Sequence, residues 1–271
     1  MILMSSLDIN HHTLIYLFCA TLHEPSLQGR PGCDDIFFIE SDGLYAAVKY
    51  VSENDYSGAN IKKKLSDESW LDASVREHLK VIGLIMEEYT VIPFNFGTIY
   101  ISEESLKSFI GKHATDLKKS LLYLANKEEW SVKAFCNTKR IIENIVVLSQ
   151  NVADIETQIT MSSPGKAYIL KKKKIDILGK EISGIYNTVS KLVFTRMNEL
   201  PDEFRLHTIP PEKASEDDDD MIINATFLLR KEKVDDFIAL ADSLLVAHEN
   251  IGLSLEITGP WPPYSFVNLS D

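Results

Sequence analysis

The spacing of apolar residues divides the first half of the chain into alternating strands and helices. The apolar run 13–21 is rich in β-branched and aromatic residues, which is typical of a buried strand. Asp42-Gly43 lies between two short apolar runs and favours a β-hairpin turn. Apolar side chains recur at helical spacing after Ser66 and Ser69, either of which is suited to cap the helix. The expected elements are, in order, strands at 13–21, 36–40 and 44–50, a helix at 69–89, a strand at 94–101 and a helix from 102 to about 126.

The second half of the chain has a different order of elements, namely β, α, β, β, α, β. This is the order of a ferredoxin-like fold, in which one antiparallel sheet carries helices on one face. The first helical part is longer than such a fold needs, so we expect some of it to project as a helical hairpin. The expected elements are a strand at 130–136, helices at 138–159 and 168–200, strands at 204–209 and 221–230, a helix at 234–248 and a strand at 251–258.

These patterns predict an α+β protein with two domains and a tail. The predicted N-terminal α+β domain spans residues 1–126, and the predicted ferredoxin-like domain, modified by a long helical arm, spans 127–258. Residues 259–271 form the tail. It contains three prolines, which fix φ and lack an N–H donor, so we expect an extended segment.

Composition excludes several classes of protein. The formal net charge of −12 argues against general nucleic-acid binding and against docking on anionic lipid. No apolar stretch approaches the roughly 20 residues that a membrane-spanning helix needs. The N-terminus lacks the pattern of a signal peptide, and the three cysteines form no CxxC pair, so we expect a cytoplasmic protein without disulfides.

The sequence contains no recognisable catalytic motif. Phosphate-binding glycine loops, a GxSxG elbow and an HExxH motif are all absent, and no local cluster has metal-ligand spacing. The sequence therefore offers no candidate motif for catalysis and no candidate metal or cofactor site. His78, in the first predicted helix, is either a functional base or a structural residue, and we favour the structural role.

Two charge runs also have alternative interpretations. Four consecutive lysines, Lys171–Lys174, point around the whole circumference of a helix, which favours a solvated arm over a docking patch. The acidic run 216–220 lacks the glycine and the spacing of an EF-hand loop, which favours a loop between strands over a cation site.

The C-terminal tail concentrates aromatic side chains among its prolines. Trp261, Tyr264 and Phe266 would be costly to expose together, so the tail either folds back on its own chain or presents them to a partner. We expect fold-back. Pro262 and Pro263 lack the flanking spacing of an SH3 ligand, so that kind of partner is disfavoured.

The octapeptide 259–266 (GPWPPYSF) resembles the C-terminal signature of the gas vesicle protein F/L family. Four further motifs that resemble those of this family follow the family's order, and the similarity extends from about residue 13 to 268. The positions that carry these motifs are Trp70, His78, Pro93, Phe96, Gly97, Thr98, Trp130, Lys133 and Tyr168.

The resemblance implies two α+β domains, the second a modified ferredoxin-like fold, and a tail that contacts the rest of the protein. It implies a non-enzymatic accessory protein of gas vesicle assembly, whose partners are the hydrophobic shell subunit and other accessory proteins. Two alternatives stay open. One is a ligand sensor or enzyme on a ferredoxin-like fold, for which Glu77, His78 and Lys133 are the first residues to inspect. The other is a structural component that stays on the finished vesicle.

Overall fold

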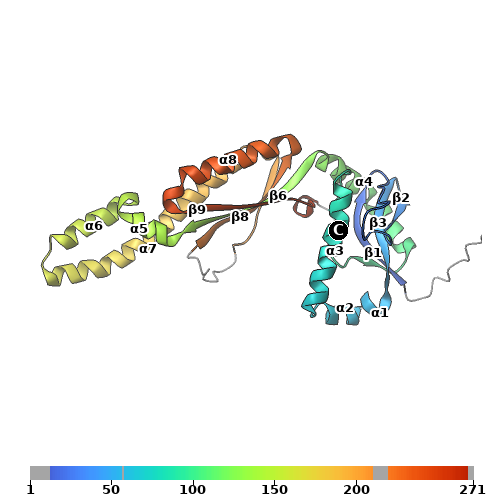
Figure 1. Cartoon of the computed structure of the whole chain (residues 1–271), viewed down its shortest axis with the longest axis horizontal. Helices are drawn as coiled ribbons and strands as arrows, with labels where there is room; N and C mark the ends of the chain where they lie inside the picture. The colour runs from blue at the N-terminus through green and yellow to red at the C-terminus, as the bar shows by residue number, and fades with distance from the viewer. Residues whose placement is uncertain (1–12, 57, 210–218, 268–271) are drawn as a thin grey trace, which may run out of the picture. The chain divides into compact units, whose positions relative to one another are not determined.

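The structure, a computed structural model, describes residues 13–56, 58–209 and 219–267. The chain mixes helices and sheets, as predicted, and divides into two compact units. The first unit contains Met1–Glu128 together with Trp261–Asp271, and the second contains Glu129–Pro260 (Figure 1). The last segment of the chain is therefore part of the first unit and not of the unit that precedes it in sequence.

The first unit is built on a five-stranded sheet in the order β2-β3-β1-β4, with β5 also paired to β1. The predicted hairpin is confirmed: Asp42 and Gly43 both have positive φ (52° and 69°), which suits the two-residue turn between right-twisted strands. The strands are β1 (Thr13–Thr21), β2 (Phe37–Ser41), β3 (Leu44–Ser52), β4 (Ile92–Pro93) and β5 (Ile99–Tyr100).

Helices cover both faces of this sheet. Ile15 and Leu17 of β1 pack in one core with residues of α4, whereas Tyr16 and Phe18 pack in another core with residues of α3. Because both faces of β1 are covered, its sequence is a continuous apolar run and not an alternating one. The helices of this unit are α1 (Glu53–Tyr56), α2 (Gly58–Lys64), α3 (Glu68–Met86) and α4 (Glu103–Leu124).

Local signals located α3 and α4 but were partly wrong about their ends, and they predicted neither α1 nor α2. Ser102 caps α4 in a capping box with Ser105, at the residue where the helix was expected to begin. The cap of α3, however, is Asp67, whose carboxylate accepts from two backbone N–H groups, and not Ser66 or Ser69. The expected strand at 94–101 is also wrong over most of its length, because β4 ends at Pro93 and only β5 (Ile99–Tyr100) lies within that range.

The second unit has a four-stranded sheet in the order β7-β8-β6-β9 and one hydrophobic core, to which its helices contribute. A helix break at Ser149 was not predicted. There the side chain of Ser149 caps α6, and Figure 1 shows α6 running beside α7. The elements are β6 (Lys127–Asn137), α5 (Thr138–Leu148), α6 (Gln150–Thr160), α7 (Pro164–Met197), β7 (Glu203–Leu206), β8 (Asp219–Arg230), α8 (Val234–Ala247) and β9 (Leu253–Trp261).

The tail and the acidic run differ from what their sequences predict. The tail is not extended throughout, since β9 continues to Trp261 and residues Tyr264–Phe266 form a 3-10 turn. That turn follows two prolines, whose missing N–H groups end the strand pairing. The acidic run 216–220 lies partly outside the described residues, and its last two members, Asp219 and Asp220, begin β8.

Candidate functional site

Four separate parts of the sequence meet at His78 in the first unit. The histidine lies on α3, faces the sheet and is only 2% exposed. Its Nδ1 lies 2.8 Å from the Tyr16 hydroxyl, and its Nε2 lies 3.1 Å from the Phe94 carbonyl oxygen and 2.9 Å from the Tyr264 hydroxyl. A helix, a strand, a loop and the C-terminal tail therefore share one buried side chain.

These hydrogen bonds determine the protonation of the ring. The Phe94 carbonyl can only accept, so we assign the proton to Nε2, and Nδ1 then accepts from the Tyr16 hydroxyl. The Tyr16 oxygen in turn accepts from the Gly97 N–H over 3.2 Å. Burial lowers the pKa of His78 to about 4, and burial raises the pKa values of Tyr16 and Tyr264. The cluster is thus uncharged at neutral pH, with both ring nitrogens of His78 occupied.

The loop between β4 and β5 is shaped to complete this network. Gly97 has a φ of +82°, a conformation that side chains with a Cβ rarely adopt. The Thr98 side chain and backbone N–H both donate to the Asn95 carbonyl, over 2.7 and 3.1 Å, and Pro93 pairs with β1. The Pro-x-x-Phe-Gly-Thr segment therefore makes a tight turn that directs one N–H to Tyr16.

Aromatic rings enclose His78. The ring of Phe18 is stacked on the imidazole with a centroid distance of 5.6 Å, and Phe96 meets it edge-on at 5.8 Å. The ring centroid of Trp70 lies 6.4 Å from that of Phe96 and 5.8 Å from that of Tyr56. These two rings therefore connect Trp70 of α3 to the cluster. Such a buried aromatic environment disfavours the charged imidazole, which explains why the pKa of His78 is lowered.

The C-terminal tail packs against this cluster. Pro262, Pro263 and Phe266 are buried, and Phe266 is only 3% exposed. Tyr264 packs against the core on the α3 side of the sheet, whereas Val267 packs against the core on the α4 side. The tail residues Pro262–Val267 therefore make contacts with both cores of the first unit.

An ion pair lies beside the aromatic cluster. Lys49 Nζ is 2.5 Å from Glu77 Oε1, and the same ammonium lies 5.9 and 5.8 Å from the ring centroids of Tyr16 and Phe18. The lysine is 9% exposed, so its charge needs this carboxylate and the ring faces. Glu77 and His78 thus both have partners within their own unit.

Three of the predicted positions belong to the second unit. Trp130 packs on the core of that unit. Lys133 lies 3.9 Å from Glu256 in an exposed ion pair, and Tyr168 is 61% exposed with Lys172 Nζ 5.0 Å from its ring centroid. The candidate positions therefore form one buried cluster and a separate scattered set.

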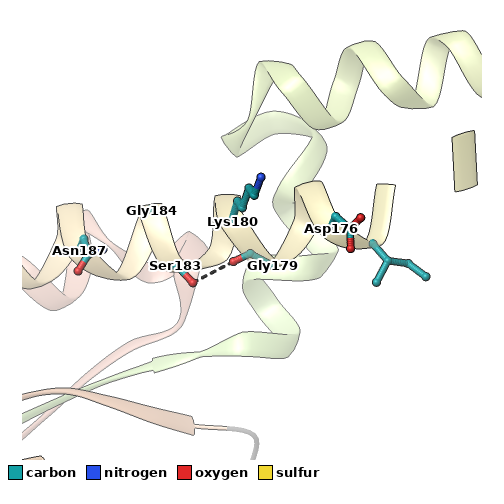
Figure 2. Close-up of a pocket in the computed structure, with 7 residues that line it drawn as sticks. Asp176, Gly179, Lys180, Ser183, Gly184 and Asn187 are labelled. Carbon is teal, nitrogen blue, oxygen red and sulfur yellow. Dashed lines mark hydrogen bonds between the residues drawn. The ribbon is translucent and has the colours of Figure 1, made fainter. Parts of the chain in front are cut away.

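Outside the His78 cluster, the described residues offer few features of a binding site. Within 13–56, 58–209 and 219–267, no three His, Cys, Asp or Glu side chains are placed to hold a metal ion. None of the described helices combines the length and apolarity required to cross a membrane. A surface groove follows α7 alone, as Figure 2 shows, and its lining residues are Ile175, Asp176, Gly179, Lys180, Ser183, Gly184 and Asn187.

A comparison with protein families decides the affiliation of the chain. The model of the family described as "Gas vesicle synthesis protein GvpL/GvpF" matches residues 14–268. The chain belongs to the GvpL/GvpF family. The resemblance drawn from the tail and the four internal motifs is thereby confirmed.

Individual members of the GvpL/GvpF family are similar over nearly their whole length. Gas vesicle protein L1 of Halobacterium salinarum is 23% identical over 262 residues, which cover 93% of this chain and 89% of that protein. Gas vesicle protein L of a Streptomyces species is 20% identical over 239 residues, covering 84% and 81%. The crystal structure of GvpF from Anabaena sp. PCC7120 has a TM-score of 0.69 at 19% identity, with 96% of this chain and all of that chain covered.

Sequence reasoning missed several members of the cluster. Tyr16 and Phe18 appeared only as part of an apolar strand, and Lys49 as part of a hairpin. The one available signal was a tyrosine within the apolar run 13–21, because a buried hydroxyl needs a partner. That partner, His78, is 62 residues away in sequence, so no local pattern identifies it.

Proposed function

We propose that this chain is a non-enzymatic accessory protein of gas vesicle assembly, which binds the hydrophobic shell subunit, other gas vesicle proteins or both during nucleation or shell formation. The observation that carries the proposal is membership of the GvpL/GvpF family over residues 14–268. The relatives are named as gas vesicle proteins, and they match over most of their own length.

The chemistry of the His78 cluster supports a role without catalysis. A general base must reach a substrate proton with an available nitrogen. Both nitrogens of His78 are hydrogen-bonded to other residues of the chain, and burial holds its pKa near 4. The positions that resemble family motifs in this unit thus serve to hold the fold and the tail together.

A physical reason favours an acidic partner for a shell-forming protein. A subunit that must expose an apolar surface tends to aggregate before assembly. A net charge of −12 favours solubility, so the chain can bind such a subunit and oppose its precipitation.

Finer features of the fold are part of the same proposal. We assign the second unit as a modified ferredoxin-like domain with a helical arm, supported by the element order β6, α5–α7, β7, β8, α8, β9 and by its single sheet. We assign the tail as a segment that folds back on its own chain, supported by the contact between Tyr264 and His78. The expected location is the cytoplasm, at forming or finished gas vesicles.

Co-precipitation tests the proposed partners. The shell subunit and each accessory protein of the same gas vesicle system are immobilised separately and incubated with the purified full chain. We expect retention by at least one of them after a high-salt wash, because apolar contacts persist when surface charges are screened. Absence of binding to every one of these proteins would contradict the proposal. Immunodetection on washed vesicles then separates a transient factor from a retained component.

A further inference from the structure

The outer face of α7 carries apolar side chains that the chain leaves in solvent. Tyr168 is 61% exposed and Ile175 is 69% exposed. Together with Lys172 and Gly179, they follow one another at intervals of four, three and four residues, which places all four on one stripe of the helix. Figure 2 shows the glycine end of this stripe, beside Ser183.

Gly179 is not required by the packing of the chain itself. A Cβ built there would have nothing within 4 Å. Glycine inside a helix costs about 1 kcal/mol relative to alanine, so a small side chain at this position lowers stability without relieving any internal clash. Close packing of another molecule against this point of α7 would explain the glycine.

The same part of α7 is basic, although the chain as a whole is acidic. Residues 164–184 contain six lysines and two carboxylates, whereas the formal net charge of the chain is −12. Lys172 lies within the apolar stripe and Lys171 lies beside it, whereas Lys174 forms an ion pair with Glu156 of α6. A surface of this kind fits an amphipathic helix whose polar residues are acidic.

The outer face of α8 has the complementary chemistry. This helix contains three aspartates and no basic residue. Asp235, Ala239, Asp242 and Val246 are exposed and are also spaced by four, three and four residues. Val246 is 80% exposed, and the neighbouring Ile238 is 37% exposed. The chain thus carries both a basic-apolar and an acidic-apolar helix face.

We propose that the chain self-associates head to tail, with the outer face of α7 in one copy packed antiparallel on the outer face of α8 in a second copy. The shared spacing places Tyr168 opposite Val246, Lys172 opposite Asp242 and Ile175 opposite Ala239. Gly179 then lies opposite Asp235, where the missing side chain allows the close approach. This contact is independent of the shell-binding function proposed above.

Geometry and electrostatics determine the form of the assembly. Two different faces pair, so the contact is heterologous and continues into rings or open chains. Mutual repulsion between acidic copies opposes it, but charges farther apart than the Debye length of about 8 Å at physiological salt are largely screened. The close pair of Lys172 and Asp242 is screened less, so association should survive at that salt concentration.

Charge reversal with sedimentation velocity tests this contact on the full chain. Wild-type protein should form larger species as its concentration rises. Lys172→Glu and Asp242→Lys should each weaken self-association about tenfold or more, because like charges then face each other. An equal mixture of the two variants should associate again, since each reversed face meets an opposite charge on the other variant.

Lys119→Glu, the same charge change at an exposed position of α4, serves as the matched control and should associate like wild type. Three results would overturn the proposal. They are a wild-type chain that stays monomeric at every concentration, single variants that associate like wild type, and a mixture that stays monomeric. Circular dichroism on each variant shows that it is folded, so that loss of association is not mistaken for unfolding.

Discussion

At the scale of single residues, the first unit depends on a buried histidine that stays neutral. His78 joins β1, the loop after β4 and the C-terminal tail through hydrogen bonds of 2.8–3.1 Å. Its ring is stacked on Phe18 in an apolar environment. Histidine suits this position because one nitrogen donates while the other accepts, so a single side chain satisfies groups of both kinds.

Removal of one hydroxyl tests the link between the tail and α3. Tyr264→Phe deletes the group that lies 2.9 Å from His78 Nε2 and leaves the ring packing intact. We expect the free energy of unfolding to fall by about 0.5–1.5 kcal/mol, the net value of one hydrogen bond. Urea unfolding measures this, with Tyr168→Phe on the exposed face of α7 as the control. Equal stability of the two variants would contradict the link.

The pH dependence of stability tests the neutral state of His78. Its pKa is about 4 in the folded chain and about 6.5 when unfolded, so between these values the unfolded state binds more protons. The contribution of neutral His78 to the free energy of unfolding should therefore be fully present above pH 6.5. About 3 kcal/mol of it should be lost as the pH drops to 4.

A variant that cannot titrate isolates this contribution from that of the carboxylates. His78→Gln should be less stable than wild type at pH 7, yet it should lose less on acidification to pH 4. Urea unfolding at a series of pH values measures the difference in slope. Parallel curves for wild type and variant would show that His78 does not titrate as a buried neutral group.

At the scale of elements, β9 is held against β6 at a point where only glycine fits. Gly259 has a φ of +155°, and a Cβ there would lie 2.8 Å from a ring carbon of Trp130 and 3.0 Å from the Glu129 carbonyl oxygen. Gly259→Ala should lower the free energy of unfolding by about 1–3 kcal/mol. Gly83→Ala, within α3 and with nothing within 4 Å of the new Cβ, should instead raise it by about 0.5–1 kcal/mol. Thermal and urea unfolding of both variants check the opposite signs.

Truncation tests the tail as an element. A chain that ends at Trp261 keeps β9 complete and loses the buried Pro262, Pro263 and Phe266. We expect a lower melting temperature, because removal of a buried phenylalanine alone usually costs about 3–5 kcal/mol. Phe266→Ala in the full chain should reproduce much of the loss. An unchanged melting temperature would contradict fold-back and favour a tail that binds a partner.

Elements were predicted correctly where the interaction that determines them lies between residues close in sequence. The turn at Asp42-Gly43 and the cap at Ser102 depend on residues within three positions, and both are present. The break at Ser149 was missed because apolar spacing continues across it. The partners of His78 were missed because one of them, Tyr264, is 186 residues away. Burial and pKa at this site are products of tertiary packing that no local pattern encodes.

At the scale of the whole molecule, the GvpL/GvpF family match from residue 14 to 268 covers both units and the tail contacts. The chain passes from the first unit into the second and returns to the first at Trp261. The tail motif and the internal motifs at Trp70, His78 and Gly97 therefore converge on one folded unit, although they are far apart in sequence.

Deletion and complementation test the central claim, a role in gas vesicle assembly, most directly. The gene for this chain is removed from a gas-vesicle-forming host that has no second member of the family, and vesicles are counted by electron microscopy. The account predicts that vesicles are lost or malformed and that the wild-type chain restores them. Vesicles of normal number and shape in the deletion strain would contradict it.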